Sequence, residues 1–153
     1  MKVIFLDFDG VLNSAAFFRT CREEGAMFDP KALAYLAEIV AATDAVIVLS
    51  TSWRKHWQYE QAKSDSVGQY IHTLFREYAM TVVDKTPCLS MFDRPEEIRQ
   101  YLKAHPEVEH FVILDDFAFG WEELSEHLVR THYYLDSGLS AEHRDRAIAI
   151  LNA

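Results

Sequence analysis

The sequence lacks the features that mark several common protein classes. Its two cysteines, Cys21 and Cys88, lie far apart and form no metal-ligand pair, so we expect reduced thiols and no disulfide framework. No apolar run approaches the roughly 20 residues that a membrane-spanning helix needs. Met1 and Lys2 lead directly into a strand-like run too short for a signal peptide, so we expect a cytoplasmic protein without a membrane partner.

Basic residues are also scarce. The 153-residue chain has 15 Lys and Arg against 24 Asp and Glu, which gives a formal net charge of −9. We therefore expect no broad basic surface for non-specific nucleic-acid binding, although a local basic patch is compatible with these numbers. What the chain does have is 50% hydrophobic and 13% aromatic residues. This composition suits a packed core, and we expect a single domain over residues 1–153.

Short apolar runs alternate with amphipathic segments along the chain. Strands are predicted at residues 3–8, 45–50, 80–84, 110–116 and 131–135. Helices are predicted at residues 29–43, 66–79 and 93–105, and after Ser140. Alternation of strand and helix predicts a doubly wound α/β domain around a mainly parallel, five-stranded, Rossmann-like sheet.

Local signals predict where several helices begin. Asp29 and Pro30 suit the N-cap and the first position of the first helix. The spacing of Asp93 and Glu96 predicts a capping box for the third helix, and Ser140 is expected to cap the last one.

Carboxylates and hydroxyls follow three of the predicted strands. They are Asp7 and Asp9 after the first strand, Ser50, Thr51 and Ser52 after the second, and Asp115 and Asp116 after the fourth. Because the carboxyl ends of parallel strands meet at one edge of a sheet, these side chains are expected in one crevice. The four carboxylates would repel one another there, and Mg²⁺ would relieve the repulsion by taking carboxylate oxygens as ligands. The sequence therefore predicts a Mg²⁺ site.

The close spacing of Asp7 and Asp9 fits a shared substrate. Residues i and i+2 of an extended strand point the same way, so both carboxylates can face one ligand while Phe8 faces a packing layer. This expectation requires the strand to persist through residue 9. Gly10 follows directly and leaves the backbone free to turn sharply near an anion.

The order DFDGVLN, VLSTSWR and LDD resembles the haloacid dehalogenase (HAD) superfamily of phosphohydrolases, whose first motif is DxDG[TV]. The resemblance covers nearly the whole chain. The STSWR stretch, the DRPEEI helix start, the ILDD strand and the late SGLS resemble more narrowly the HAD domain of Swiss-Army-Knife RNA repair proteins. The resemblance implies a Mg²⁺-dependent phosphatase that hydrolyses a phosphate monoester through an aspartyl-phosphate intermediate.

The resemblance also implies roles for single carboxylates. Asp7 would be the nucleophile that attacks phosphorus, and Asp9 would be the general acid and then the general base. The backbone carbonyl of Asp9 would help bind Mg²⁺, so Asp7, Asp9, Asp115 and Asp116 are the expected metal residues. At least one of Asp115 and Asp116 would bind the metal directly or through water.

Phosphate-binding residues follow from the same resemblance. Ser50 would hydrogen-bond a phosphoryl oxygen, with Thr51 as the alternative if the register shifts by one residue. A helix-capping role suits Ser52 better than either of them. The basic residue of the third motif would be Arg94, at the start of a helix, or Lys85, just after the third strand.

Aromatic and basic residues near the second motif have open roles. Trp53 is expected to be a packing aromatic, and Arg54 would contact substrate or pair with a site carboxylate. Phe17, Phe18 and Trp57, together with Trp53, could stack on nucleic-acid bases, although core packing explains them equally well. The seven histidines show no ligand spacing and are expected to be incidental.

The chain has no room for the separate cap domain that many HAD enzymes carry. Residues 13–28 allow a short flap, and residues 54–80 allow one or two helices. A capless or minimally covered site favours a large phosphate ester, such as a nucleic-acid end or another macromolecule, over a small enclosed metabolite. The sequence leaves the oligomeric state open.

Two other classes of function share a fold of this type. One is a phospho-acceptor signalling module of the receiver kind, and the other is a non-catalytic binding domain. In receivers the acidic pair comes on the first strand and the acceptor Asp later, which opposes the order found here. A decayed site would be expected to lose some of its four carboxylates, and all four are present.

Overall fold

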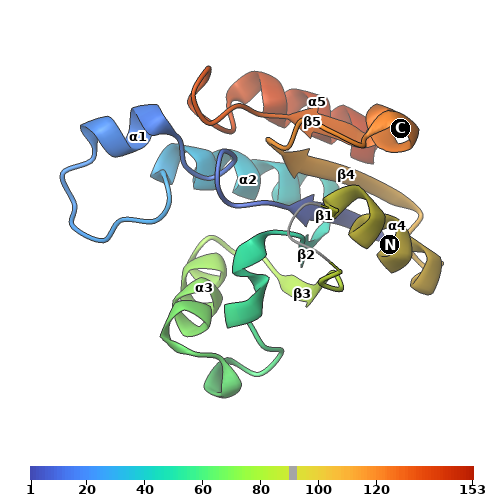
Figure 1. Ribbon diagram of the computed structural model, residues 1–153, viewed down its shortest axis with the longest axis horizontal. Coiled ribbons are helices and arrows are strands. Elements are labelled where there is room, and N and C mark those ends of the chain that lie inside the picture. Colours follow the sequence, from blue (N-terminus) through green and yellow to red (C-terminus); the bar gives the residue numbers. More distant parts are fainter. Residues whose placement is uncertain (90–92) are drawn as a thin grey trace.

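A parallel sheet of five strands runs through the centre of the computed structural model, in which residues 1–89 and 93–153 are described. The strands are β1 (Lys2–Leu6), β2 (Val46–Leu49), β3 (Val82–Lys85), β4 (His110–Asp115) and β5 (Leu128–Arg130). Their order across the sheet is β3-β2-β1-β4-β5, and every neighbouring pair is parallel (Figure 1). The predicted doubly wound α/β architecture is confirmed.

Helices connect the strands and cover both faces of the sheet. The α-helices are α1 (Ala15–Thr20), α2 (Pro30–Thr43), α3 (Ser66–Glu77), α4 (Arg94–Ala104) and α5 (Ala141–Leu151). Three short 3-10 helices are η1 (Ser52–His56), η2 (Gln61–Lys63) and η3 (Glu122–His127). None of the helices in the described part of the chain is long and apolar enough to cross a membrane.

The strand side chains alternate between two cores. Ile4 and Leu6 of β1 face a core that α2, α3 and α5 complete. Val3 and Phe5 face a second core, to which α4 contributes Ile98. Since both faces are buried, the strands carry nearly continuous apolar runs, as is usual in parallel sheets.

The strand register explains why polar residues distant in the sequence converge. Leu6, the last residue of β1, pairs with Leu49 of β2 on one side and with Leu114 of β4 on the other. The ladder continues for one more step, because the N–H of Ser50 donates to the Leu6 carbonyl (3.0 Å) and that of Asp7 to the Leu114 carbonyl (3.0 Å). The first polar residues after these strands therefore lie side by side.

The predicted caps of two helices are confirmed. The Asp29 carboxylate accepts the backbone N–H of Lys31 (2.9 Å) at the start of α2. At α5 the Ser140 hydroxyl accepts the N–H of His143 (3.4 Å), and the His143 ring in turn accepts the N–H of Ser140 (3.1 Å). A histidine thus takes the acceptor position of this capping box.

The capping box predicted for α4 is wrong. Asp93 occupies the N-cap position, but its side chain makes no capping bond, and its ψ of 47° departs from the extended backbone of a typical N-cap. Glu96 instead accepts the Nε–H of Arg99 (2.9 Å), one turn further along the helix. A side-chain pair within the helix therefore replaces the predicted bond to the backbone.

The fifth strand is shifted from its predicted position. β5 covers Leu128–Arg130, whereas the sequence predicts residues 131–135. The N–H of Thr131 extends the ladder to β4 by one residue, and the chain then turns. The Asp136 carboxylate closes this turn by accepting a backbone N–H four residues earlier (3.1 Å), and Tyr134 is 82% exposed. The aromatic residues that favour a strand, Tyr133 and Tyr134, therefore lie in a loop, where Tyr134 faces solvent and Tyr133 is half-buried.

Candidate active site

The turn after β1 separates Asp7 from Asp9. The strand ends at Leu6, and the carbonyl of the buried Phe8 accepts the N–H groups of Val11 and Leu12 in the turn that follows. Asp7 is 4% exposed, and its Oδ1 accepts the N–H of Phe8 (2.9 Å). Asp9 is exposed. The extended conformation expected through residue 9 is not found, although Phe8 does face the core.

Two neutral donors hold the Asp9 carboxylate. Its Oδ1 accepts from Asn13 Nδ2 (3.0 Å), and its Oδ2 accepts from the indole Nε1 of Trp53 (2.9 Å). Asn13 Oδ1 accepts the N–H of Gly10 (3.0 Å), which fixes the amide that faces Asp9. Trp53 also packs against the core, as expected, but its bond to Asp9 was not predicted. Asn13 was not singled out from the sequence either.

Three carboxylates form a compact acidic group at the carboxyl ends of β1 and β4. Asp7, Asp115 and Asp116 each offer an oxygen within 4.8 Å of the others. Gly10 makes room for this group: it has a φ of +83°, and a Cβ there would lie 2.2 Å from Asp116 Oδ2. The Thr131 hydroxyl donates to the Gly10 carbonyl (2.6 Å) and holds the turn in place.

Arg94, at the start of α4, lies against two of these carboxylates. Its Nη1 is 2.7 Å from Asp7 Oδ2 and 2.9 Å from Asp115 Oδ2. Lys85 does not reach them, because its Nζ donates to the carbonyls of Arg54 (3.1 Å) and Trp57 (2.6 Å). Of the two cations predicted for this position, the structure brings only Arg94 into contact with Asp7.

Burial and mutual repulsion favour protonation of the acidic group. Burial, and then the charge of Asp115, raise the pKa of Asp7, although Arg94 opposes the shift. Burial also raises the pKa of Asp115. Burial and the charge of Asp7 raise the pKa of Asp116 to about 6. A single guanidinium cannot balance three carboxylates, so the donor set fits a divalent cation such as Mg²⁺.

The residues after β2 divide their roles differently from the prediction. Ser50 is buried, and its Oγ has no hydrogen-bond partner among the described residues. The Thr51 hydroxyl caps η1 by accepting the N–H of Trp53 (3.3 Å), so the capping role expected for Ser52 belongs to Thr51. Because a buried hydroxyl without a partner is destabilising, the Ser50 Oγ has a hydrogen-bonding capacity that a ligand can satisfy.

A buried ion pair supports this strand end. Arg54 Nη2 donates to Glu97 Oε2 of α4 (2.8 Å), and both side chains are almost fully buried. Arg54 Nη1 donates to the carbonyls of Ser50 (2.9 Å) and Thr51 (2.8 Å). Arg54 thus pairs with a carboxylate outside the acidic group and anchors the backbone that carries Ser50. Glu97 was not singled out from the sequence.

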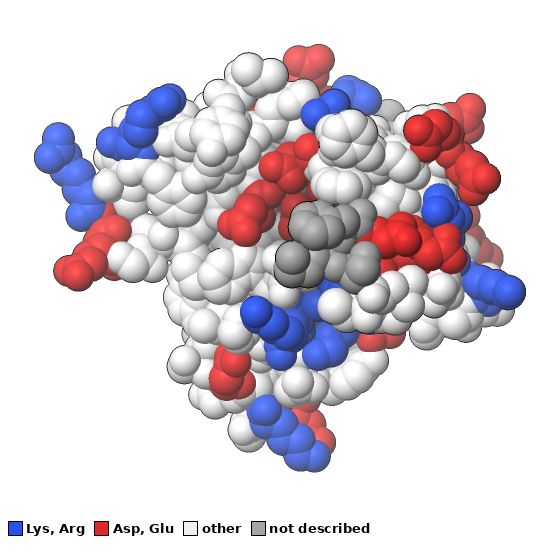
Figure 2. Space-filling model, in the orientation of Figure 1, with Lys and Arg blue, Asp and Glu red and all other residues white. Residues whose placement is uncertain are grey.

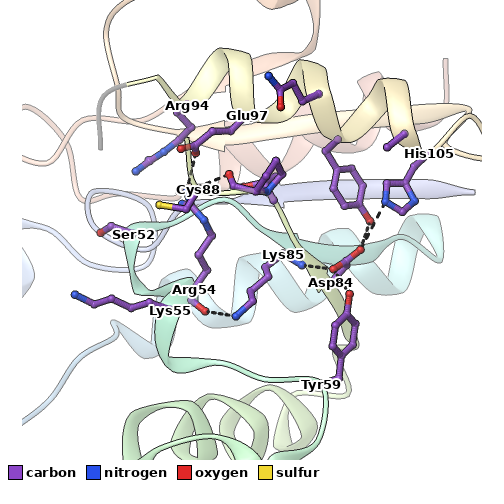
Figure 3. Close-up of a pocket in the computed structure, with 15 residues that line it drawn as sticks. Ser52, Arg54, Lys55, Tyr59, Asp84, Lys85, Cys88, Arg94, Glu97 and His105 are labelled. Atoms are coloured by element: carbon purple, nitrogen blue, oxygen red, sulfur yellow. Dashed lines mark hydrogen bonds and ion pairs between the residues drawn. The ribbon is translucent and has the colours of Figure 1, made fainter. Parts of the chain in front are cut away.

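A cavity of about 760 Å³ lies between η1, the end of β3 and α4. Figure 3 shows Arg94 at one end of it and His105 at the other. Two of its cations are already paired, since Arg54 pairs with Glu97 and Arg94 with the acidic group. The hydroxyls of Tyr59 and Tyr101, two tyrosines of the lining, donate to the Asp84 carboxylate.

The surface charge agrees with the composition. On the face shown in Figure 2, Lys and Arg side chains occur in small separate groups with Asp and Glu side chains between them. This face therefore offers no broad basic surface, as the net charge of −9 predicts.

Comparison with known proteins identifies the family. No curated protein and no solved structure gives a significant match to the chain. The family described as the HAD domain in Swiss Army Knife RNA repair proteins matches residues 3–144, which is nearly the whole chain, and confirms the resemblance drawn from the motifs. The chain belongs to this family of HAD domains.

Proposed function

We propose that the protein is a Mg²⁺-dependent phosphatase that hydrolyses a phosphate monoester through an aspartyl-phosphate on Asp7. Membership of the HAD family suggests phosphohydrolase-type chemistry. The observation that carries the proposal is the pairing of a buried Asp7, held against Arg94, with an exposed Asp9 held by neutral donors. Two carboxylates in such different environments suit two different roles.

In the first step Asp7 attacks phosphorus. A carboxylate oxygen of Asp7 forms a bond to phosphorus as the ester P–O bond breaks, and the leaving oxygen takes a proton from Asp9. In the second step Asp9 accepts a proton from a water molecule, which attacks the aspartyl-phosphate and releases inorganic phosphate. Asp7 is then a free carboxylate and Asp9 is again protonated, so the cycle closes.

Neighbouring groups would hold the phosphoryl oxygens. The Ser50 hydroxyl, which has no partner in the described part of the chain, can donate to one of them, and the Arg94 guanidinium can offset their charge. Asp7, Asp115 and Asp116, with the backbone carbonyl of Asp9, would hold Mg²⁺. The ion would neutralise phosphoryl charge that the single guanidinium leaves uncompensated.

The substrate we propose is the phosphorylated end of a nucleic acid. The family description supports it, because it refers to RNA repair proteins. The lack of a large insertion over the site supports a macromolecular ester too: between β1 and α2 the chain inserts only α1 and a loop, and between β2 and β3 only η1, η2 and α3. A chain end can enter such a site while the rest of the polymer stays outside.

The test follows both the intermediate and turnover. Wild-type protein with Mg²⁺ should hydrolyse an aryl phosphate, and acid quenching followed by peptide mass spectrometry should find phosphate on Asp7. Asp7→Asn should abolish both signals, whereas the matched control Asp145→Asn, at an exposed site on α5, should change neither. Full turnover by Asp7→Asn would refute the nucleophile.

Asp9→Asn separates the two proposed steps. An aryl leaving group needs little protonation, so this variant should still form the aspartyl-phosphate and then accumulate it, because water activation is lost. A wild-type protein that takes up one phosphate and never releases it would instead favour the phospho-acceptor module.

A further inference from the structure

A small pocket opens directly beside Asp9. It has a volume of about 190 Å³ and lies between α1, the loop after α1, and η1. Asp9 forms part of its wall, and the apolar walls include Phe18, Met27, Phe28 and Trp53. The proposed acid therefore borders an apolar, aromatic space.

The aromatic walls differ in how firmly they are held. Phe28 is 6% exposed and packs edge-on against Phe8, with the ring centroids 5.0 Å apart. The Trp53 indole is fixed by its bond to Asp9 (2.9 Å). Phe18 is 42% exposed, and no residue of α1 is buried against the described parts of the chain. Phe18 thus contributes little to the core and leaves much of its ring available to a ligand.

Only part of the aromatic set suggested by the sequence lines this pocket. Phe18 and Trp53 are at the pocket, whereas Trp57 is 1% exposed and belongs to the core. Phe17 packs against Phe18 with the ring centroids 5.3 Å apart. Of these four rings, Phe18 and Trp53 can therefore meet a ligand beside Asp9. Phe17 supports Phe18, and Trp57 supports the core.

We propose that this pocket binds one flat aromatic ring of the leaving group, and that Phe18 and Trp53 select esters that carry such a ring. The inference rests on the proposed function, because the leaving oxygen must reach Asp9. The volume is below the roughly 300 Å³ at which pockets for whole drug-sized ligands begin, so it suits a single ring with the rest of the substrate outside. Two ring sources fit: a nucleobase on a sugar phosphate, or an aryl group next to the ester oxygen.

The experiment compares kcat/KM within pairs of esters that share the same type of leaving oxygen. One pair is a pyrimidine nucleoside 5′-phosphate and ribose 5-phosphate, which differ by the base. The other is benzyl phosphate and cyclohexylmethyl phosphate, which differ by the flatness of the ring. Preference within the first pair identifies a nucleobase as the ring, and preference within the second identifies an aryl group.

Wild-type protein should prefer the flat-ring ester of one pair by roughly tenfold, the order expected for one stack on an aromatic side chain. Phe18→Leu keeps an apolar side chain but removes the ring, and should bring that ratio to within about twofold of one. The control Tyr134→Leu, at an 82% exposed position outside the pocket, should keep the full preference.

The outcomes that overturn the pocket differ from the one that overturns the proposed function. Hydrolysis without ring preference in wild-type protein, or a preference that survives Phe18→Leu, would refute the pocket while leaving the phosphatase intact. Hydrolysis of an aryl phosphate but of none of the four esters would also refute the pocket. Failure to hydrolyse the aryl phosphate as well would refute the proposed function, and the pocket's role with it.

Discussion

The Arg54–Glu97 pair supplies a prediction whose size follows from burial. We expect Glu97→Gln to lower the free energy of unfolding by about 3 kcal/mol, the lower end of the range for breaking a buried ion pair by removing one partner. The Arg54 and Glu97 side chains are 7% and 1% exposed, so water cannot hydrate the guanidinium once Glu97 has lost its charge. The loss leaves the Arg54 guanidinium buried and uncompensated.

The hydrogen bonds around Glu97 explain why glutamine is a poor substitute. Its Oε2 accepts from Arg54 (2.8 Å), and its Oε1 accepts the N–H of Leu89 (3.1 Å). Both neighbours are donors, and a glutamine amide has only one acceptor oxygen, so its NH₂ group must face one of them. One donor therefore loses its partner in addition to the lost charge.

The measurement is urea-induced unfolding with a control from the adjacent position. Glu96→Gln makes the same chemical change in the same helix turn, but Glu96 and its partner Arg99 are 39% and 35% exposed. We expect this control to change the unfolding free energy by less than about 1 kcal/mol. In thermal unfolding, the 3 kcal/mol expected for Glu97→Gln corresponds to a decrease in Tm of roughly 6–12 °C.

A double variant tests whether charge burial is the cause. Replacing both partners, Arg54→Met with Glu97→Met, removes the unpaired charge and should be less destabilising than the sum of the two single changes. Recovery should be incomplete, because Arg54 also donates to two backbone carbonyls after β2. Equal effects of Glu97→Gln and Glu96→Gln would refute this reasoning.

Three further predictions concern the acidic group. Arg94→Gln should lower kcat/KM for an aryl phosphate by about 100-fold, because it removes the guanidinium beside Asp7, whereas Arg99→Gln should not; equal activities would contradict the proposed role. Gly10→Ala should weaken Mg²⁺ binding, measured by calorimetry, by at least about tenfold, because the added Cβ would collide with Asp116. Gly25→Ala is the control: Gly25 also has a positive φ (+75°), but an added Cβ there meets no other atom, so this variant shows the effect of backbone strain alone. The third prediction applies when a chelator keeps metal out of the site. The pKa of Asp116 is then about 6 in the folded state against an ordinary 3.8, so the unfolded state loses this proton at lower pH than the folded state. The free energy of unfolding should therefore fall as the pH rises from about 3.8 to about 6. Asp116→Asn should flatten that fall in a pH series of urea titrations, and an unchanged slope would show that other groups cause it.

The fold could be predicted because its signals are local and repeated. Four apolar runs, each bounded by helix signals, predict strands, and the structure confirms them as β1 to β4. β5 failed because Leu128–Arg130 is too short to show a pattern, while the nearby aromatic residues have strand-like composition but lie in an exposed turn. These three residues form a strand because they pair with β4, and the composition of a segment does not indicate which strand it pairs with.

The candidate site was predictable where residues follow a strand end and obscure where they depend on a turn or a distant partner. Register alone places Asp7, Ser50 and Asp115 side by side. The bond from Trp53 to Asp9 and the pair of Arg54 with Glu97 join residues more than 40 positions apart. No sequence pattern marks such contacts, because each side chain also suits a packing or surface position.

The short distance between Asp7 and Asp9 in the sequence does not put them in one electrostatic environment. Because the chain leaves the sheet after Leu6 and turns at Phe8, Asp7 remains at the buried strand end beside Arg94, while Asp9 moves to the surface. Asn13 and Trp53 then hold Asp9 through neutral donors without adding a charge. A carboxylate near a metal and a phosphoryl group suits nucleophilic attack, and one outside that charged group can exchange protons with a leaving oxygen or water. The turn itself is therefore what would allow two like residues, two positions apart, to take the different roles proposed for them.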